Sequence, residues 1–382
     1  MILKTLVRFV GVSFMLTRTA AQPYENNHQQ YMKYLSSDLK RLDTKALTPV
    51  KEGEQEPLKW AFASTLKDSN SRDLKTLLVK LNENALSPNE FAFEWAYEYR
   101  ATKLSLDVYD VFYQNNLYIL CGQAKSRQSG KNRGFIATVK ASGAFKRAKL
   151  YPETSVLASI VPWQSGTGYI AVGKAQVPDG QTKTDAVVLS VGSKLKPECG
   201  RRFFGKFDEA DPSMIDSGFR KVIKYKKKDE KFYAVVGETT VFKDEFCSRR
   251  SEVLVALVDK KCEVSESRQY GGLDPIQNQG AMISARGVSI TQWDLKKKKG
   301  GLVITGNVRS TSNCEENVYF DDVLVFKTKG NLDIDWTGRY SIQPGLEVRM
   351  SICYGLKFWT WSFLSKAELT QKHWLLVSSA FT

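Results

Sequence analysis

Short apolar runs that end at a small residue recur through the middle of the chain. These small residues, called anchor residues below, are Ala63, Gly122, Gly173, Gly237 and Gly306. Each run has the length and composition of a β-strand, and the anchors follow one another at roughly 50 to 70 residues, a period typical of repeat proteins. The pattern therefore predicts a repeat protein whose units are built of strands.

Further strands are predicted on both sides of each anchor. A second apolar strand follows the loop after the anchor, at Leu74–Leu81, Gly134–Lys140, Asp185–Val191, Glu252–Val258 and Asp322–Lys327. An aromatic strand comes next and is clearest at Trp95–Tyr99 and Trp336–Tyr340. A first strand precedes each later anchor, at Leu104–Tyr113, Val156–Trp163, Arg220–Lys226 and Ala285–Trp293. Four strands per unit, joined by short hairpins, are typical of a β-propeller blade.

The strands must be covered on both faces. Runs such as residues 186–189 are apolar throughout, so both faces of the strand must be buried away from water. Neighbouring blades stacked around an axis provide that cover, and glycine at the strand end suits a backbone that approaches a neighbour closely or takes a positive φ. We therefore predict an all-β fold, a β-propeller of four-stranded antiparallel blades over residues 49–344 with at least five units. A β-sandwich or a solenoid is the alternative.

The two ends of the chain differ from this repeat. Residues 1–21 combine a basic start, a short apolar run and small residues, the pattern of a cleaved secretory signal that leaves Gln22 near the mature N-terminus. A membrane anchor is the alternative, but the apolar run is shorter than a bilayer span. Residues 22–48 are predicted as an N-terminal helical segment, because Glu25–Ala46 places apolar residues at three- and four-residue steps. Residues 345–382 are predicted as a partial blade or an irregular tail.

One unit carries a family resemblance. Leu302–Gly306 followed by Asp322–Gly330, Trp336 and Tyr340 resembles the repeat of secreted β-propeller-repeat proteins, and Arg268–Gly272 resembles the end of that repeat. The resemblance extends over residues 59–344. It implies a binding or surface scaffold and supplies no catalytic residues. The sequence departs from the repeat at its first anchor, which is alanine, and at two second strands that lack the initial aspartate.

Cysteine and histidine usage narrows the chemistry. Six cysteines fit an oxidising compartment, and they allow 15 pairings between which the sequence does not choose. The cysteines form no CxxC pair, and the only histidines, His28 and His373, lie outside the repeats. We therefore expect no metal site, no cofactor and no histidine-dependent triad within the repeats.

The charge indicates an acidic partner. The chain has a formal net charge of +15, and part of the excess falls in two hairpin turns that precede anchor strands. We predict a binding face made of these turns and of two tryptophans that end first strands: Lys226, Lys227, Lys228, Lys296, Lys297, Lys298, Lys299, Trp163 and Trp293. An acidic glycan or an acidic protein surface is the expected partner. Lysines that are merely solvated, and tryptophans of the core, are the alternative.

Two function classes follow from these patterns. The first is a secreted, non-enzymatic binding or scaffold protein, which the repeats, the signal and the lysine turns favour. The second is an extracellular hydrolase or lyase that uses channel carboxylates, since a fold does not fix a function. Nucleic acid fits the charge but not the secretory signal, and no transmembrane segment is expected.

Overall fold

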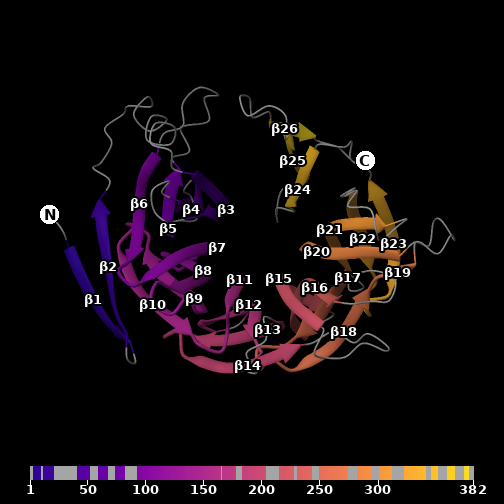
Figure 1. Ribbon diagram of the computed structural model, residues 1–382, viewed down its shortest axis with the longest axis horizontal. Helices are drawn as coiled ribbons and strands as arrows, with labels where there is room; N and C mark the ends of the chain where they lie inside the picture. The colour runs from indigo at the N-terminus through magenta and orange to yellow at the C-terminus, as the bar shows by residue number, and fades with distance from the viewer. Residues whose placement is uncertain are drawn as a thin grey trace. The chain divides into compact units, whose positions relative to one another are not determined.

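The computed structural model describes residues 3–9, 12–20, 41–51, 59–67, 74–81, 93–164, 166–177, 183–203, 215–227, 230–242, 249–273, 282–293, 301–311, 322–340, 346–351, 359–365 and 374–377. All regular elements in these ranges are β-strands (Figure 1). Neighbouring strands pair antiparallel, as β16 and β17 do. Within the same ranges no helix is long and apolar enough to cross a membrane.

The chain divides into two compact units. Unit 1 comprises residues 1–162 and 192–196, and unit 2 comprises residues 163–191 and 197–382. The strands of unit 1 are β1 (Leu3–Phe9), β2 (Val12–Ala20), β3 (Arg41–Val50), β4 (Lys59–Lys67), β5 (Leu74–Leu81), β6 (Phe93–Ala101), β7 (Leu104–Gln114), β8 (Leu117–Ser126), β9 (Asn132–Lys140), β10 (Phe145–Tyr151) and β11 (Val156–Pro162). In sheet order β3 to β6 are consecutive, as are β7 to β10.

Unit 2 repeats the same arrangement. Its strands are β12 (Gly168–Gln176), β13 (Thr184–Gly192), β14 (Pro197–Phe203), β15 (Ile215–Lys227), β16 (Glu230–Phe242), β17 (Arg249–Val258), β18 (Val264–Tyr270), β19 (Gly272–Leu273), β20 (Met282–Gln292), β21 (Leu302–Thr311), β22 (Asp322–Thr328), β23 (Ile334–Tyr340), β24 (Leu346–Ser351), β25 (Trp359–Ser365) and β26 (Trp374–Val377). The sheet orders are β15-β16-β17-β18, β19-β20-β21-β22-β23 and β24-β25-β26, and β12, β13 and β14 are consecutive in their sheet. The four-stranded antiparallel sheets are consistent with propeller blades, as predicted.

The predicted second strands are confirmed with shifts of up to three residues at their ends. The prediction that a strand ends at its anchor is wrong, because β8, β16 and β21 continue through their anchor glycines to Ser126, Phe242 and Thr311. The strand predicted at Leu74–Leu81 is β5 without change, and the one predicted at Asp322–Lys327 is β22, one residue longer. Their apolar residues are buried on both faces, as the sequence of β13 illustrates with Ala186 and Val188 at 0% exposure and Val187 at 5%. Each unit has its own apolar core, around Val108 and Leu120 in unit 1 and around Val255 and Ile304 in unit 2.

The prediction of an N-terminal helix is wrong for the residues that the structure describes. Arg41–Val50 is the strand β3, paired antiparallel with β4 so that Ala46 lies opposite Ala63. Pairing along β4 satisfies a row of backbone hydrogen bonds, which outweighs the helical spacing of a few apolar residues. The remainder of the predicted helix, residues 25–40, lies outside the described ranges. The predicted signal region coincides with the hairpin of β1 and β2, and its cleavage stays a prediction.

The anchor glycines Gly122, Gly237 and Gly306 lie opposite a β-bulge in the first strand of their sheet. In β15 the register shifts between Phe219 and Lys221, opposite Gly237, and a Cβ at Gly237 would lie 1.9 Å from the carbonyl oxygen of Gly218. The same conflict arises at two further anchors, between Gly122 and Asp107 and between Gly306 and Arg286. Two reasons were predicted for glycine at the anchors, the close approach of a neighbouring backbone and a positive φ. At these positions it is the close approach that requires glycine.

A recurring hydrogen bond joins successive sheets. A tyrosine hydroxyl in a fourth strand donates to a backbone carbonyl in the turn between the third and fourth strands of the next sheet. The pairs are Tyr99 with Gly143 at 2.8 Å, Tyr151 with Leu195 at 3.0 Å and Tyr270 with Leu332 at 2.5 Å. The three carbonyls belong to residues that share a positive φ, so the turns have a common backbone shape.

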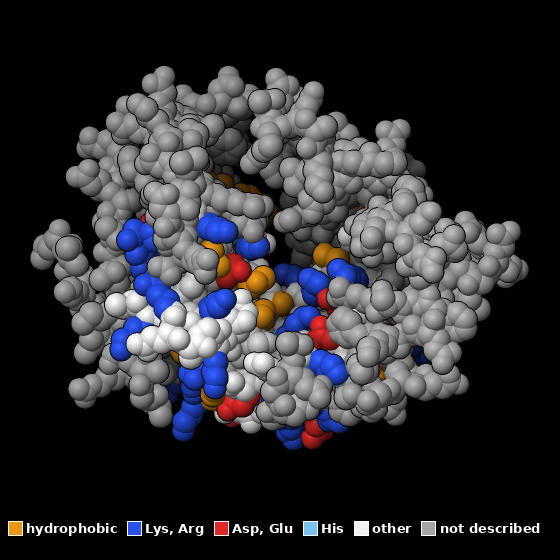
Figure 2. All heavy atoms as spheres, viewed as in Figure 1, with side chains coloured by type: hydrophobic (Ala, Val, Ile, Leu, Met, Phe, Trp, Pro, Cys, Tyr) orange, Lys and Arg blue, Asp and Glu red, His pale blue; other side chains and the backbone are white. Residues whose placement is uncertain are grey.

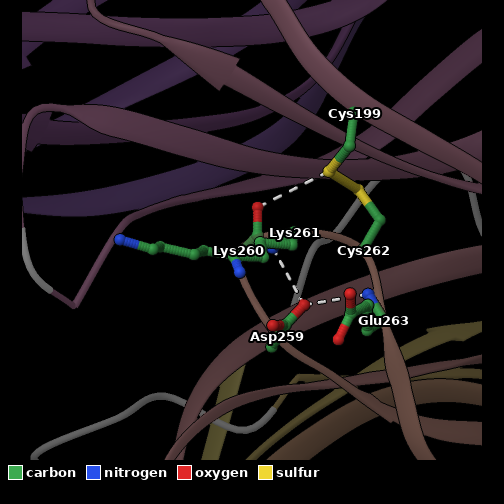
Figure 3. The surroundings of a disulfide bond; sticks show 6 residues. All are labelled: Cys199, Asp259, Lys260, Lys261, Cys262 and Glu263. Atoms are coloured by element: carbon green, nitrogen blue, oxygen red, sulfur yellow. Dashed lines mark hydrogen bonds between the residues drawn. A yellow bond between two sulfur atoms is a disulfide. The ribbon is translucent and has the colours of Figure 1, made fainter.

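At the fourth such position a disulfide takes the place of the tyrosine. Strand β14 ends at Phe203, which has no hydroxyl, and instead Cys199 of β14 is bonded to Cys262 in the β17–β18 turn, with Cα atoms 6.1 Å apart (Figure 3). Cys262 has the same positive φ as Leu195 and Leu332. Asp259 closes this turn, because its carboxylate accepts the backbone N–H groups of Lys261 and Glu263 at 2.8 Å each. The bond therefore fixes the same contact by a covalent link.

Candidate functional site

The residues predicted as a binding face are only partly described. Lys226 is exposed at the end of β15, and Lys227 forms an ion pair with Glu266. Gln292, at the end of β20, donates to the Lys226 carbonyl at 2.8 Å and accepts its N–H at 3.2 Å, so the ends of these two first strands lie side by side. Lys228 and Lys296 to Lys299 lie outside the described ranges. A binding role for the lysine turns stays a prediction.

The two predicted tryptophans have different surroundings. Trp163 is half-buried, and its ring lies over Gly168, where a Cβ would come within 2.5 Å of it. Trp293 is 47% exposed, and the ammonium of Lys327 lies 5.4 Å from its ring centroid. Trp163 therefore fits the core alternative, while Trp293 is a surface residue that pairs with a lysine.

A charged cluster in unit 2 was not predicted. It consists of one buried carboxylate, a second carboxylate and three cations, here called the Glu238 cluster: Lys174, Asp216, Arg220, Glu238 and Arg286. These residues come from the first or second strands of consecutive sheets, β12, β15, β16 and β20. The cluster therefore draws on three sheets of one unit.

Glu238 is the centre of the cluster. Its side chain is 6% exposed, and its Oε1 accepts a hydrogen bond from Arg220 Nη2 at 2.7 Å. Arg286 Nε forms an ion pair with Oε2 at 3.1 Å, and Oε2 is buried without a hydrogen bond. The side chains of Arg220 and Arg286 remain 43% and 42% exposed. One buried carboxylate thus holds two arginines that still face solvent.

Lys174 connects Glu238 with Asp216. Its Nζ lies 4.0 Å from Glu238 Oε1 and 3.6 Å from Asp216 Oδ2. Asp216 Oδ1 accepts the backbone N–H of Thr184 at 2.9 Å and also the Thr184 hydroxyl, which fixes the orientation of the carboxylate. The Asp216 side chain is 20% exposed. Asp216 is therefore the more accessible of the two carboxylates.

A glycine makes room for the lysine. Strand β15 carries Gly218 directly opposite Glu238, and a Cβ there would lie 2.3 Å from Lys174 Cε. The aliphatic part of Lys174 therefore crosses β15 at the position that lacks a side chain. Any larger residue at position 218 would displace the lysine from both carboxylates.

The charges keep Glu238 ionised. Burial on its own raises the pKa of this carboxyl, but the positive charges of Arg220, Arg286 and Lys174 outweigh burial and hold the pKa below 4.5. Three cations face two carboxylates, so the cluster carries an excess of positive charge. On the molecular face drawn in Figure 2, Lys and Arg side chains are also more abundant than Asp and Glu side chains among the described residues.

A signal for this cluster is present in the sequence. The residue after each anchor is polar although it lies within an apolar strand: Ser64, Gln123, Lys174, Glu238 and Asn307. In β12 and β16 this residue belongs to the cluster, and Arg220 is the extra residue of the bulge opposite the anchor Gly237. The anchor residues predict only the strands. The polar residue that follows an anchor, together with the bulge opposite it, indicates the position of the cluster.

Comparisons with known proteins give little further guidance. No family model matches the chain, and no curated protein is similar to it. A solved structure of a GH32 beta-fructofuranosidase from Bombyx mori, a mutant in complex with sucrose, matches with 9% identity over 86% of this chain and 83% of the other, at a TM-score of 0.24. This match is to an enzyme, which contradicts the prediction of a non-enzymatic binding protein, and that prediction is not retained. At so low a TM-score the match carries no argument about substrate or reaction.

Proposed function

We propose that the protein is a secreted β-propeller enzyme, a hydrolase or lyase acting on glycans, with its reaction at the Glu238 cluster. The signal-like N-terminus supports secretion, and the repeated four-stranded sheets support the propeller. The observation that carries the proposal is that two carboxylates, Asp216 and Glu238, lie within 4.0 Å of one lysine ammonium beside two solvent-facing arginines.

Lys174 lies next to both carboxylates. Its Nζ is 3.6 Å from Asp216 Oδ2 and 4.0 Å from Glu238 Oε1. An accessible carboxylate beside an ammonium group supplies a base and an acid side by side, which suits acid–base chemistry.

The exposures suggest a role for each member. Asp216 reaches solvent and is oriented by Thr184, so it is the carboxylate placed to exchange a proton with a substrate. Lys174, 28% exposed, is a proton donor next to it. Glu238 is too deeply buried to touch a substrate, and it acts as a positioning residue that holds Arg220 and Arg286. Those arginines supply positive charge where negative charge develops during hydrolysis or elimination.

The proposal is tested by assaying the purified protein on a panel of neutral and acidic polysaccharides. Hydrolysis releases reducing ends, whereas a lyase releases them together with the ultraviolet absorbance of a new carbon–carbon double bond conjugated to a carboxylate. We expect one of these two signals on at least one substrate and its loss in Asp216→Asn. Absence of both signals over the whole panel, for protein shown to be folded, would contradict the proposal.

A further inference from the structure

We propose that Trp293 and Trp336 form a second sugar-binding site, at which a neutral sugar ring of a polysaccharide contacts their indole rings. The site belongs to the sheet that contains β20, β21, β22 and β23 in unit 2. Trp293 directly follows β20 and lies about 20 Å along the chain from Arg286 of the Glu238 cluster, the length of seven extended residues. One sugar ring cannot reach both places, so this site goes beyond the proposed reaction.

Lys327 lies next to both tryptophans. It is directly opposite Trp336 in the pairing of β22 with β23, so the two side chains are on one face of the sheet. Its ammonium lies 5.4 Å from the centroid of the Trp293 ring and 2.6 Å from Asp335 Oδ2. Asp335 is the extra residue of a bulge, because the register shifts between Lys327 and Thr328, and a bulge re-aims side chains. Two tryptophans therefore share one ion-paired lysine as a neighbour.

The backbone at Trp293 is fixed by its surroundings. Its N–H donates to the Gly301 carbonyl at 2.9 Å, which closes the hairpin of β20 and β21. A Cβ at Gly301 would lie 1.6 Å from the carbonyl oxygen of Thr328, so the end of this hairpin packs closely against β22. A ligand therefore meets a position that is already ordered, which lowers the entropic cost of binding.

Both tryptophans are exposed, unlike the others whose side chains the structure describes. Trp293 is 47% and Trp336 41% exposed, while Trp60, Trp95 and Trp163 are half-buried. The exposed area of the two rings is on the order of 200 Å², since a buried tryptophan covers at most about 250 Å². A protein partner covers about 800 Å² on each side of an interface. The two rings therefore suit a small ligand better than a second protein.

Unit 1 contains the same arrangement with its tryptophan packed against another ring. Lys80 lies opposite Trp95, Glu94 is the extra residue at the register shift, and Lys80 Nζ lies 2.7 Å from Glu94. The rings of Trp95 and Tyr118 have centroids 5.4 Å apart. At the equivalent position in unit 2 the indole of Trp336 meets solvent. We interpret this position as the place for a ring that a ligand supplies.

A sugar ring matches the chemistry of these groups. Its C–H faces are apolar and contact aromatic rings, while the hydroxyl groups at its edge need hydrogen-bond partners. The Lys327 ammonium has three N–H donors, of which Asp335 accepts one, and Asp335 is itself an acceptor that is 36% exposed. The hydrogen bond from Lys327 holds the pKa of Asp335 below 3.8, so the pair is ionised at neutral pH and its charges cancel. A neutral sugar therefore fits better than a uronic acid.

The experiment measures the binding of soluble neutral polymers, a β-glucan, a xylan and a galactomannan, by isothermal titration. Neutral probes are needed because a net charge of +15 attracts the protein to any polyanion. We expect at least one polymer to bind, and Trp293→Ala and Trp336→Ala each to weaken its binding by about 10-fold, the share of one stacked aromatic contact. Salt between about 0.05 and 0.5 M should change the affinity little, because screening acts only on charges.

Ile334→Ala is the matched control. Ile334 is 50% exposed on the same strand, but it lies opposite Thr328 and is thus on the other face of the sheet from Trp336. Its replacement should leave the affinity unchanged, whereas Trp336→Phe keeps an aromatic ring and should retain most of the affinity. Urea unfolding verifies that each variant is folded. A much lower urea midpoint for Trp336→Ala together with parental affinity would show that this ring packs within the protein, and would overturn the proposal.

The outcomes separate this site from the proposed reaction. Failure of every neutral polymer to bind, an equal loss in Ile334→Ala, or a steep loss of affinity with salt would each overturn the site. If the protein cleaves a polymer, Trp336→Ala should raise KM and keep kcat, and a loss of kcat alone would place Trp336 in the reaction and overturn a separate site. Binding of a neutral polymer without turnover of any substrate would support the site and contradict the proposed function.

Discussion

Two buried ion pairs, one in each unit, use opposite arrangements. In unit 1 the buried member is a cation: Lys80 is 1% exposed, and its Nζ lies 2.7 Å from Glu94, a carboxylate that is 35% exposed and also contacts Lys59 at 3.0 Å. In unit 2 the buried member is the carboxylate of Glu238, and its partners Arg220 and Arg286 face solvent. The sign of the buried charge therefore decides whether a carboxylate or cationic side chains face the solvent.

The difference suggests different roles. Both oxygens of Glu94 are taken by ammonium groups, one each, so this pair has little to offer a ligand. In the Glu238 cluster, Arg220 and Arg286 contact one carboxylate while 43% and 42% of their side-chain surface stays exposed. We therefore interpret the Lys80 pair as structural and the Glu238 cluster as functional, and variants of the two acidic residues should separate stability from activity.

The largest loss of stability is expected for Glu94→Gln. It leaves the buried ammonium of Lys80 without its carboxylate, and breaking a buried pair in this way costs about 3 kcal/mol. Activity per folded molecule should be unchanged. Urea unfolding measured by fluorescence checks the first statement and a polysaccharide assay the second. A stability equal to that of the parent would show that Lys80 is not held by this pair.

A smaller loss of stability, about 1–2 kcal/mol, is expected for Glu238→Gln. The cations that contact Glu238 are 28 to 43% exposed and stay hydrated in the variant. Activity should fall at least tenfold, because Arg220 and Arg286 lose the group that positions them. Glu252→Gln is the matched control, since Glu252 is also buried, at 8% exposure, on the adjacent strand β17. An activity loss of the same size in the control would remove the special status of Glu238.

Acid should act on both pairs in the same direction. For Glu94, burial raises the pKa of the carboxyl, but Lys80 and Lys59 outweigh burial and the pKa lies below 4.5. For Glu238, Arg220, Arg286 and Lys174 have the same effect. A carboxyl whose pKa is lowered by folding stabilises the protein fully above its unfolded pKa, and the contribution is lost as the pH falls through the lower folded value. The unfolding free energy of the parent should therefore drop below about pH 4.5. The double variant Glu94→Gln/Glu238→Gln should show a shallower decrease over the same range, and an equal slope would contradict these pKa directions.

The smallest effect is expected for Lys80→Met. Replacing a buried charge by an apolar side chain of similar length is often neutral or stabilising, so we expect a change of less than about 1 kcal/mol in the unfolding free energy. Glu94 keeps Lys59 and solvent as partners in this variant. A loss as large as that of Glu94→Gln would mean that the Lys80 ammonium itself stabilises unit 1, and that Glu94 does more than neutralise its charge.

The strands were predictable because their signals are local. Apolar runs, turn residues and the anchors define β5 and β22 almost to the residue. The failure at Arg41–Ala46 has a physical cause: three- and four-residue spacing favoured a helix, while pairing with β4 placed these residues in a strand. At the first anchor alanine stands in place of glycine, and Ala63 also lies beside a register shift, between Thr44 and Ala46.

The candidate site was not predictable in the same way. Lys174 and Glu238 are 64 residues apart in the sequence, and their meeting depends on the stacking of three sheets and on Gly218, which lets the lysine cross β15. The lysine turns were predicted as a binding face because they are runs of consecutive like charges, a pattern visible in the sequence alone. Isolated charges inside apolar strands stand out less, although burial makes each of them more consequential.

The central claim is that the reaction takes place at the Glu238 cluster, and Asp216→Asn tests it most directly. Asp185→Asn is its matched control, because Asp185 is 19% exposed against 20% for Asp216 and is likewise paired with a cation. On the substrate that the parent cleaves best, we predict that Asp216→Asn reduces kcat by at least about 100-fold, the contribution of an acid or base, while Asp185→Asn retains the parental value. Equal activity of the two variants would contradict the claim.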